Sequence, residues 1–279
     1  MGVKHVVLLA HPSGHSLSPV MQNSAFKALG LSARYEAVDV PPKDLPTIVE
    51  ELRNPKFVGA NVTVPHKVSI TKLVDELSQD ASIVGAVNTV VRQGSKLVGH
   101  NTDGEGFLRG LADLNYEPTG DRVLLLGAGG AARAVAVSLL GREVESLSVY
   151  NRTLHKANDL VKDLSHIGPI KTLRSEEVSL ELDRADLLVN ATSVGMEKDG
   201  ISDEEMPLPI GCFPKRGIVV DLVYRPERTR LLREAGKHGL VIQNGLPMLV
   251  YQGAGSIQKW FGQTPPTEEM FKAVLSALK

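Results

Sequence analysis

The sequence has one cysteine among its 279 residues, Cys212, and no group of cysteines and histidines at the spacing of a metal site. One cysteine cannot form an internal disulfide, and a chain that depends on no disulfide suits a reducing compartment. We therefore expect a cytoplasmic protein without a metal ion. A lone cysteine can be a nucleophile, but it is more often a buried or incidental thiol, so Cys212 is assigned no role.

The sequence also lacks long apolar runs and an excess of one charge. No run approaches the roughly 20 apolar residues of a membrane helix, and the short apolar run near the start is interpreted as a first strand instead of a signal peptide. The net charge of −1 gives no support for a nucleic-acid surface or a polybasic membrane patch. We therefore expect neither nucleic acid nor membrane as a partner. The oligomeric state stays open, with a homodimer among the options.

Length and composition are those of a globular protein of about two domains. Hydrophobic residues make up 42% of the chain and charged residues 23%, which is ordinary for packed domains. From residue 122 onward, strand-like apolar runs alternate with helix-like segments, a pattern typical of a parallel α/β sheet. In this region we expect strands over 122–126, 146–150, 186–190, 217–221 and 240–243.

A glycine-rich turn stands between an apolar strand and an alanine-rich helix. Gly127, Gly129 and Ala132 have the G-x-G-x-x-A spacing of a dinucleotide-binding turn. The first glycine allows the sharp turn, the second lets a pyrophosphate approach the backbone, and the alanine lets the helix pack closely on the strand. The helix N-terminus also offers free N–H groups to an anion. Such turns occur as plain connectors too, but the flanking elements favour a dinucleotide site made by Gly127, Ala128, Gly129, Gly130 and Ala131.

The strand at 146–150 is followed by a cation where dinucleotide-binding folds usually have an acid. A carboxylate at this position bonds the adenine ribose hydroxyls, but the sequence has Asn151, Arg152 and Thr153 instead. The planar guanidinium of Arg152 suits a phosphate, and Lys156 can assist it. If Arg152 were only a surface charge, the absence of the usual acidic residue would stay unexplained. The pattern therefore indicates the 2′-phosphate of NADP.

Two serines, Ser16 and Ser18, follow the first expected strand at residues 5–10. Their hydroxyls could face a polyhydroxy ligand, or Ser18 could simply be the N-cap of a helix that begins at Pro19 and runs to about Leu29. Spacing alone favours neither alternative.

The strand expected at residues 57–60 brings an amide, a hydroxyl and an amine to one place: Asn61, Thr63 and Lys67. Most lysines are solvated surface groups. Here, however, a strand end meets the expected start of a helix near Pro65, which is where ligand sites form in α/β proteins. A lysine gains nothing from the dipole at a helix N-terminus, so another interaction should keep it there.

A β-hairpin expected over 86–92 and 97–100 leads into Asp103. Asp103 can be the N-cap of the following helix, at about 104–115, without any further function. Asn88 and Asp103 both lie near turns from which they could converge on Lys67, but the sequence alone does not show that they do.

Two loops follow the strands at 186–190 and 217–221, at the strand ends where such sheets meet a cofactor. The side chains concerned are Thr192, Ser193, Met196, Leu222 and Tyr224. Beyond these loops, we expect helices over 226–236, 248–261 and 267–278.

Taken together, the motifs are similar to those of the shikimate dehydrogenase family over the whole length of the chain. Several are weak individually, but in this order the set is highly specific. The matching pieces are Ser-Leu-Ser-Pro at 16–19, Asn-Val-Thr-Val-Pro-His-Lys at 61–67, Asn-Thr-Asp-Gly at 101–104, Gly-Ala-Gly-Gly-Ala-Ala at 127–132, Asn-Arg-Thr at 151–153, Asn-Ala-Thr-Ser-Val-Gly-Met at 190–196, Asp-Leu-Val-Tyr at 221–224 and Gln252-Gly.

The resemblance implies a two-domain α/β enzyme, with an N-terminal α/β substrate domain and a Rossmann-like NADP-binding domain. Residues 1–103 and 245–279 would form the substrate-binding catalytic domain, and residues 104–244 the NADP-binding domain. The implied activity is the reversible, NADPH-dependent reduction of 3-dehydroshikimate to shikimate, in the shikimate pathway of aromatic amino acid biosynthesis.

The resemblance also implies roles for individual residues. Lys67 and Asp103 would be the catalytic pair. Tyr224 would lie near the substrate, and Met196, Leu222 and Gly245 near the nicotinamide. The groups that hold the carboxylate and hydroxyls of shikimate would be Ser16, Ser18, Asn61, Thr63, Asn88, Asp103 and Gln252. One departure from the family pattern, at residues 10–14, is interpreted as loop variation.

Two other functions compete with this interpretation. A quinate/shikimate dehydrogenase that prefers NAD is disfavoured because Arg152 is present and no acidic residue stands beside it. A non-catalytic dinucleotide sensor on the same fold is disfavoured by Lys67 and Asp103, because a sensor needs no proton shuttle.

Overall fold

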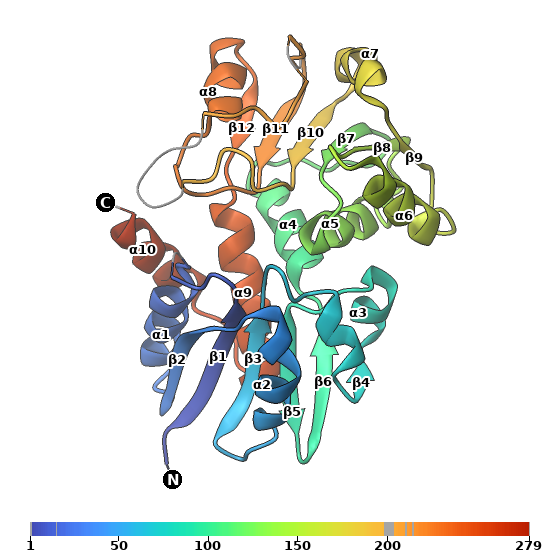
Figure 1. Cartoon of the computed structure of the whole chain (residues 1–279). Helices are drawn as coiled ribbons and strands as arrows, with labels where there is room; N and C mark the ends of the chain where they lie inside the picture. Colours follow the sequence, from blue (N-terminus) through green and yellow to red (C-terminus); the bar gives the residue numbers. More distant parts are fainter. Residues whose placement is uncertain (1, 15, 198–203, 210, 214, 279) are drawn as a thin grey trace. The chain divides into compact units, whose positions relative to one another are not determined.

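The computed structural model describes residues 2–14, 16–197, 204–209, 211–213 and 215–278. Backbone contacts divide the chain into two compact units, Met1–Phe107 with Leu249–Lys279 and Leu108–Met248. Each unit has its own six-stranded sheet (Figure 1), so the predicted α/β class is confirmed. Within the described part of the chain, no helix is long and apolar enough to cross a membrane.

The first unit is built on a mixed sheet with the strand order β2-β1-β3-β5-β6-β4. β1, β2 and β3 are parallel to one another, whereas β5 is antiparallel to both β3 and β6. The predicted hairpin is therefore confirmed. The strands are β1 Lys4–Ala10, β2 Ala33–Asp39, β3 Phe57–Val62, β4 Glu76–Leu77, β5 Thr89–Gln93 and β6 Lys96–His100.

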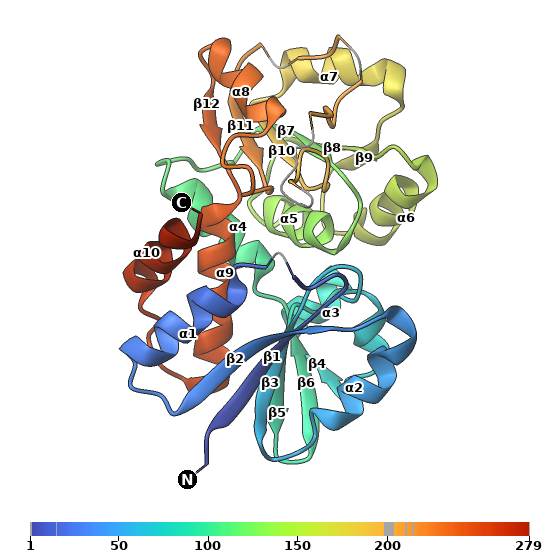
Figure 2. The ribbon, with the colours of Figure 1, turned by 60° about the vertical axis from the view of Figure 1, so that its left-hand side comes forward.

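Helices cover both faces of this sheet (Figure 2). On one side lie α1 (Ser18–Ala28), α9 (Leu246–Phe261) and α10 (Thr267–Ala277). On the other lie α2 (Leu45–Glu51) and α3 (Gln79–Val84), which pack on a core that includes Val7, Leu9 and Val62. Alternation along β1 points Val6 and Leu8 to the opposite face, where both are buried.

Two expected helices differ from the observed ones, and a 3₁₀ turn, η1 (Pro42–Asp44), directly precedes α2. No helix begins at Pro65; a 3₁₀ turn, η2, spans Ser69–Lys72, and the carbonyl of Lys67 accepts from Val87 N–H (2.8 Å) on a distant segment instead of from the following turn. The helix expected from residue 226 begins at Arg230, where the Thr229 hydroxyl caps the first turn.

The second unit is built on a fully parallel sheet with the order β12-β11-β10-β7-β8-β9. This is the doubly wound order of two mononucleotide-binding halves, with the switch point between β7 and β10. The strands are β7 Arg122–Leu126, β8 Ser146–Tyr150, β9 Ile170–Thr172, β10 Leu187–Asn190, β11 Ile218–Asp221 and β12 Val241–Gln243. The remaining helices are α4 Asp103–Ala112, which crosses the boundary between the units in sequence, and α5 Gly130–Leu140, α6 Leu154–Leu164, α7 Val178–Arg184 and α8 Arg230–Lys237.

Gly59 in β3 provides a test of how tightly the first unit packs. A Cβ at this position would lie 2.0 Å from the carbonyl oxygen of Val90 and 2.7 Å from Nε1 of Trp260. Those two atoms already bond each other at 2.9 Å. We expect Gly59→Ala to cost at least about 3 kcal/mol of unfolding free energy, because backbone and a buried ring would both have to move.

The matched control is Gly236→Ala in α8, where the nearest atom to a new Cβ is a methyl group of Ile242 at 3.7 Å. Alanine is better than glycine inside a helix, so this variant should be about 0.5–1 kcal/mol more stable. Denaturant unfolding followed by circular dichroism measures both. Equal stabilities for the two variants would contradict the packing described for β3.

Candidate active site

One edge of the first sheet gathers most of the predicted polar residues of this unit. Because β3 and β6 are both antiparallel to β5, they run in the same direction as β1, and the carboxyl ends of all three meet at one edge. The start of β5 lies at the same edge. The residues that arrive there from these strands are Ser16, Ser18, Asn61, Thr63, Lys67, Asn88 and Asp103.

Lys67 and Asp103 form a shielded ion pair at this edge. Lys67 Nζ lies 2.6 Å from Asp103 Oδ2, and the two side chains are 13% and 3% exposed. Asn88 Nδ2 donates to the other carboxylate oxygen of Asp103 at 2.9 Å. Both oxygens of the acid are therefore held, and the amine is directed to one of them. The convergence that the sequence left open is therefore present, with Asp103 in direct contact with Lys67 and Asn88 bound to Asp103.

Both members of the pair are anchored to the segment 86–88. The sequence did not predict this anchoring. Val87 N–H donates to the Lys67 carbonyl at 2.8 Å. The side chain of Asn101 donates to the Ala86 carbonyl at 2.9 Å and accepts from Asp103 N–H at 3.0 Å. Asn101 thus ties the start of α4 to the same segment that holds Lys67.

Gln252, on α9, also reaches this group. Its Oε1 accepts from Asn88 Nδ2 at 3.3 Å, and its main-chain oxygen accepts from the Thr102 hydroxyl at 2.9 Å. A Cβ at Gly106 would lie 2.7 Å from the Gln252 nitrogen, so glycine is needed for α4 to approach α9 this closely. Nothing in the sequence indicated this contact of Thr102, apart from its place in the Asn-Thr-Asp-Gly motif.

Asn61 uses its amide inside the protein. Its Nδ2 donates to Ser256 Oγ at 2.9 Å and to Thr89 Oγ1 at 3.2 Å, and its Oδ1 accepts from the Tyr35 hydroxyl at 2.8 Å. Burial raises the pKa of Tyr35 above its ordinary value, so this phenol stays a neutral donor. Asn61 is 5% exposed and is chiefly a member of this internal network.

The remaining hydroxyls of the first unit differ in their surroundings. Thr63 is half-buried, and its side chain makes no hydrogen bond to any residue that the structure describes. Ser16 Oγ accepts from Ser18 N–H at 3.2 Å. Ser18 is the first residue of α1 and does not cap it, so the N-cap alternative is wrong.

The glycine-rich turn of the second unit has the geometry of an anion cradle. Gly127 has φ +111°, and a Cβ there would lie 3.1 Å from the Ala191 carbonyl, so only glycine fits. Gly129 is the N-cap of α5, and a Cβ there would meet nothing within 4 Å. Ala132 is fully buried. The turn is closed on the protein side at residue 127 and open at residue 129, where a phosphate group fits.

Arg152 stands at the carboxyl end of β8 without an acidic partner among the described residues. It is exposed, as is Lys156 on the first turn of α6. Asn151 Nδ2 donates to the Thr153 carbonyl at 2.8 Å and shapes the turn. This is a cationic, conformationally defined strand end, as expected for binding of a phosphate monoester.

The loops after β10 and β11 converge in the same unit. Leu222 N–H donates to the Asn190 carbonyl at 2.9 Å, and Gly245 N–H donates to the Val223 carbonyl at 3.1 Å. Gly245 follows β12, and a Cβ there would lie 2.0 Å from the Leu222 oxygen, so the backbones of Gly245 and Leu222 are in close contact. The same two loops carry Thr192, Ser193, Met196 and Tyr224.

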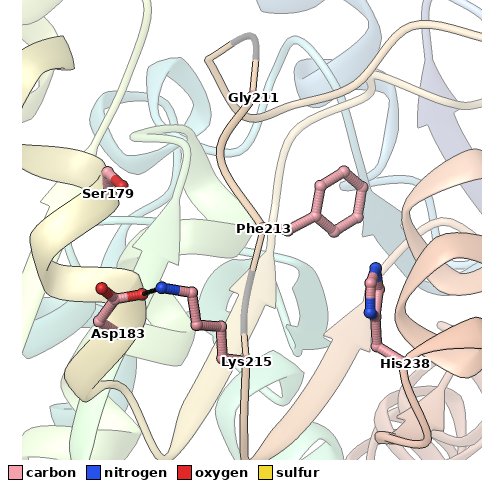
Figure 3. A pocket seen from close by; sticks show the side chains of 6 residues that line it. All are labelled: Ser179, Asp183, Gly211, Phe213, Lys215 and His238. Carbon is pink, nitrogen blue, oxygen red and sulfur yellow. Dashed lines mark ion pairs between the residues drawn. The ribbon is translucent and has the colours of Figure 1, made fainter.

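A hollow of about 320 Å³ lies elsewhere in the second unit (Figure 3). Its lining residues include Asp183 and Lys215, which precede β10 and β11, and His238, which precedes β12. It therefore lies toward the amino ends of these strands, away from the loops just described. Among the described residues, no three His, Cys, Asp or Glu side chains are grouped to hold a metal ion.

Family models cover most of the chain. The shikimate dehydrogenase substrate binding domain matches residues 8–90, shikimate/quinate 5-dehydrogenase matches 111–206, and the shikimate 5′-dehydrogenase C-terminal domain matches 245–275. A protein named shikimate dehydrogenase (NADP(+)), from Symbiobacterium thermophilum, is 44% identical over 98% of this chain and 94% of its own length. The chain belongs to the shikimate dehydrogenase family.

Solved structures of the family superpose on the whole chain. Shikimate 5-dehydrogenase of Thermus thermophilus, in complex with NADP(H) and shikimate, is 41% identical with a TM-score of 0.87, covering 99% of this chain and 100% of its own. Quinate dehydrogenase from Corynebacterium glutamicum, in complex with NAD, is 28% identical with a TM-score of 0.89, covering 99% and 100%. The fold is thus shared by proteins whose structures are complexes with different cofactors, NADP(H) and NAD.

Asp221, the last residue of β11, makes stability depend on pH. Burial raises its pKa to about 6 from the ordinary 3.8, although hydrogen bonds from Thr229, Val223 and Asn190 oppose the rise. Between these two values the folded state binds more protons than the unfolded chain. This contribution therefore lowers the unfolding free energy as pH rises through the window, by about 2 kcal/mol between roughly pH 4.5 and 7.5.

Asp221→Asn removes this titration while keeping the shape of the side chain. The unfolding free energy of wild type minus that of the variant, measured in urea, should be about 2 kcal/mol larger at roughly pH 4.5 than at pH 7.5. If the unfolding free energies of the two proteins change with pH in parallel, the pKa of Asp221 is not raised.

Proposed function

We propose that this chain is an NADP-dependent shikimate dehydrogenase, which reversibly reduces 3-dehydroshikimate to shikimate in the shikimate pathway of aromatic amino acid biosynthesis. The observation that carries the proposal is the shielded Lys67–Asp103 pair, with a 2.6 Å contact, at a strand edge that also presents Asn88 and Thr63. Family membership supports the same reaction.

Lys67 is the proton donor and acceptor in this mechanism. Bound NADPH would supply the hydride that adds to the carbonyl carbon, and this chemistry belongs to the cofactor. Lys67 Nζ gives a proton to the carbonyl oxygen as it becomes a hydroxyl, and regains one from solvent through its 13% exposed side chain. In the oxidation direction, Lys67 takes the hydroxyl proton. Asp103 orients the amine and binds a substrate hydroxyl.

The substrate is a polyhydroxy carboxylate, and the proposed binding groups have the complementary chemistry. Hydroxyls and amides can donate to the carboxylate and exchange hydrogen bonds with the ring hydroxyls. We assign this role to residues 1–103 and 245–279, and also to Tyr224. The binding groups are Ser16, Ser18, Asn61, Thr63, Lys67, Asn88, Asp103, Tyr224 and Gln252.

The second unit has the features expected for NADP, and we assign cofactor binding to residues 104–244 with Gly245. The open space at Gly129 suits a pyrophosphate, and the guanidinium of Arg152, which has no acidic partner among the described residues, suits the 2′-phosphate. The groups that would hold the cofactor are Gly127, Ala128, Gly129, Gly130, Ala131, Asn151, Arg152, Thr153, Lys156, Thr192, Ser193, Met196, Leu222 and Gly245.

Location and assembly complete the proposal. A chain with one cysteine needs no oxidising compartment to fold, which supports a cytoplasmic enzyme. A homodimer is one option for the oligomeric state, which sedimentation equilibrium measures directly.

Lys67→Ala tests the proton-transfer role. We expect kcat for 3-dehydroshikimate to fall about 10²–10⁴-fold, with little change in the substrate KM, because general acid catalysis is lost while the other binding groups remain. Steady-state kinetics of NADPH oxidation measures this. The variant also leaves Asp103 without its partner, so rates are normalised to folded enzyme by circular dichroism.

The control is Lys72→Ala, an exposed lysine of η2 on the same segment of chain. It should behave as wild type. A near-normal kcat for Lys67→Ala would end the proposal that this amine transfers the proton.

Arg152→Ala tests the cofactor assignment. Loss of a charge-assisted hydrogen bond to phosphate costs about 1.5–3 kcal/mol, so kcat/KM for NADPH should fall roughly 10–100-fold. The value for NADH, which has no 2′-phosphate, should stay the same. Lys162→Ala, at an exposed position later in α6, is the control.

The rival functions predict other results. An NAD-preferring quinate/shikimate dehydrogenase would give a wild-type ratio of kcat/KM, NADPH over NADH, near or below one. A dinucleotide sensor would bind NADPH and oxidise none of it with 3-dehydroshikimate.

A further inference from the structure

A closed set of buried hydrogen bonds joins the ends of β10 and β11. Asn190 and Asp221 are the last residues of these neighbouring strands, and neither they nor Thr229 are more than 1% exposed. Asn190 Nδ2 donates to Asp221 Oδ1 at 2.9 Å, and Thr229 Oγ1 donates to Asp221 Oδ2 at 2.6 Å. Val223 N–H donates to Oδ1 at 3.0 Å. One carboxylate therefore holds the neighbouring strand, the following loop and the start of α8.

The loop after β10 is shaped around the side chain of Asn190. Its Oδ1 accepts from the backbone nitrogen and the hydroxyl of Thr192, at 3.1 and 2.7 Å. Its Nδ2 also donates to the Val194 carbonyl at 3.3 Å. The loop then passes Thr229, where Gly195 has φ +91° and a Cβ would lie 3.3 Å from the threonine Cβ. Asp221 thus acts on this loop through Asn190 and Thr229.

The place of these bonds in the sheet indicates which part of a cofactor they serve. In a doubly wound sheet, each half binds one mononucleotide of a dinucleotide. The half made by β7, β8 and β9 carries Arg152 and is assigned the adenosine end with its 2′-phosphate. The half made by β10, β11 and β12 is left for the nicotinamide end, and the bonded loops stand at its carboxyl edge.

We propose that Asp221 is a positioning residue for hydride transfer, which holds the two nicotinamide-side loops in register through Asn190 and Thr229. The inference rests on the proposed function and adds to it a residue that touches neither substrate nor cofactor. Asp221 acts as a hydrogen-bond acceptor, and its charge is not needed. Asparagine at this position can still accept from Val223 and Asn190, and its amide can donate to the Thr229 hydroxyl.

The test compares Asp221→Ala with Asp221→Asn and with Asn190→Ala, which cuts the link on the other side. For Asp221→Ala and Asn190→Ala we expect kcat with NADPH and 3-dehydroshikimate to fall roughly 10²-fold, the scale of loss from slight misplacement of reacting groups. Binding of 2′,5′-ADP, which lacks the nicotinamide half, should be unchanged by calorimetry. Asp221→Asn should restore most of the rate.

The control is Ser148→Ala in β8, which removes a part-buried hydrogen bond from the same sheet to Glu181 of α7, at 2.9 Å, without touching either loop. It should leave both measurements as in wild type. If Asp221→Ala does not fold, Asn190→Ala decides the matter alone. A wild-type rate in either folded variant, or a parallel loss of 2′,5′-ADP binding, would overturn the positioning role.

Failure of the proposed function would look different. Wild-type protein would then oxidise no NADPH with 3-dehydroshikimate. The positioning role would still be measurable, as weaker NADPH binding in Asn190→Ala, followed by nicotinamide fluorescence, with 2′,5′-ADP binding intact. Equal losses of affinity for NADPH and for 2′,5′-ADP would overturn the positioning role in that case as well.

Discussion

The proposed chemistry depends on one buried interaction, the contact between the ammonium of Lys67 and the carboxylate of Asp103. Removing two charges from water costs several kcal/mol each, and the cost is recovered only where the geometry is good and the remaining polar atoms are bonded. The structure meets this condition, because Asn88 binds the second oxygen of Asp103 and the segment 86–88 holds the backbone of Lys67. The fold around the pair is arranged to keep it in place.

The two units contribute different physical features to the proposed reaction. The first unit has strands ending at one edge, where polar groups and one ion pair are concentrated. The second has a parallel sheet with a switch point, a turn that only glycine can form at residue 127, and a cation after β8. In the proposed function, discrimination between NADP and NAD rests on Arg152 and on the absence of a carboxylate beside it.

Local patterns in the sequence predicted most of the strands, the hairpin and the glycine-rich turn, because each depends on residues close in the chain; they missed the short strands β4 and β9. The same patterns were wrong about the helix near Pro65, where the carbonyl of Lys67 instead bonds Val87, twenty residues away in sequence. They also gave no hint that Asn101 anchors the pair or that Asn190 and Asp221 join two loops. Such bonds link distant residues and have no periodicity to reveal them. Asn61 shows the same limit, because its residue type does not tell which way its amide points.

The most direct test of the central claim is the wild-type reaction itself. Oxidation of NADPH is followed spectrophotometrically with 3-dehydroshikimate, and repeated with NADH and, in the reverse direction, with quinate. A chain that has both a proton-transfer pair and an NADP site is expected to oxidise NADPH rapidly, with a much larger kcat/KM than for NADH. A protein that binds NADPH but leaves it unoxidised in the presence of 3-dehydroshikimate would contradict the account.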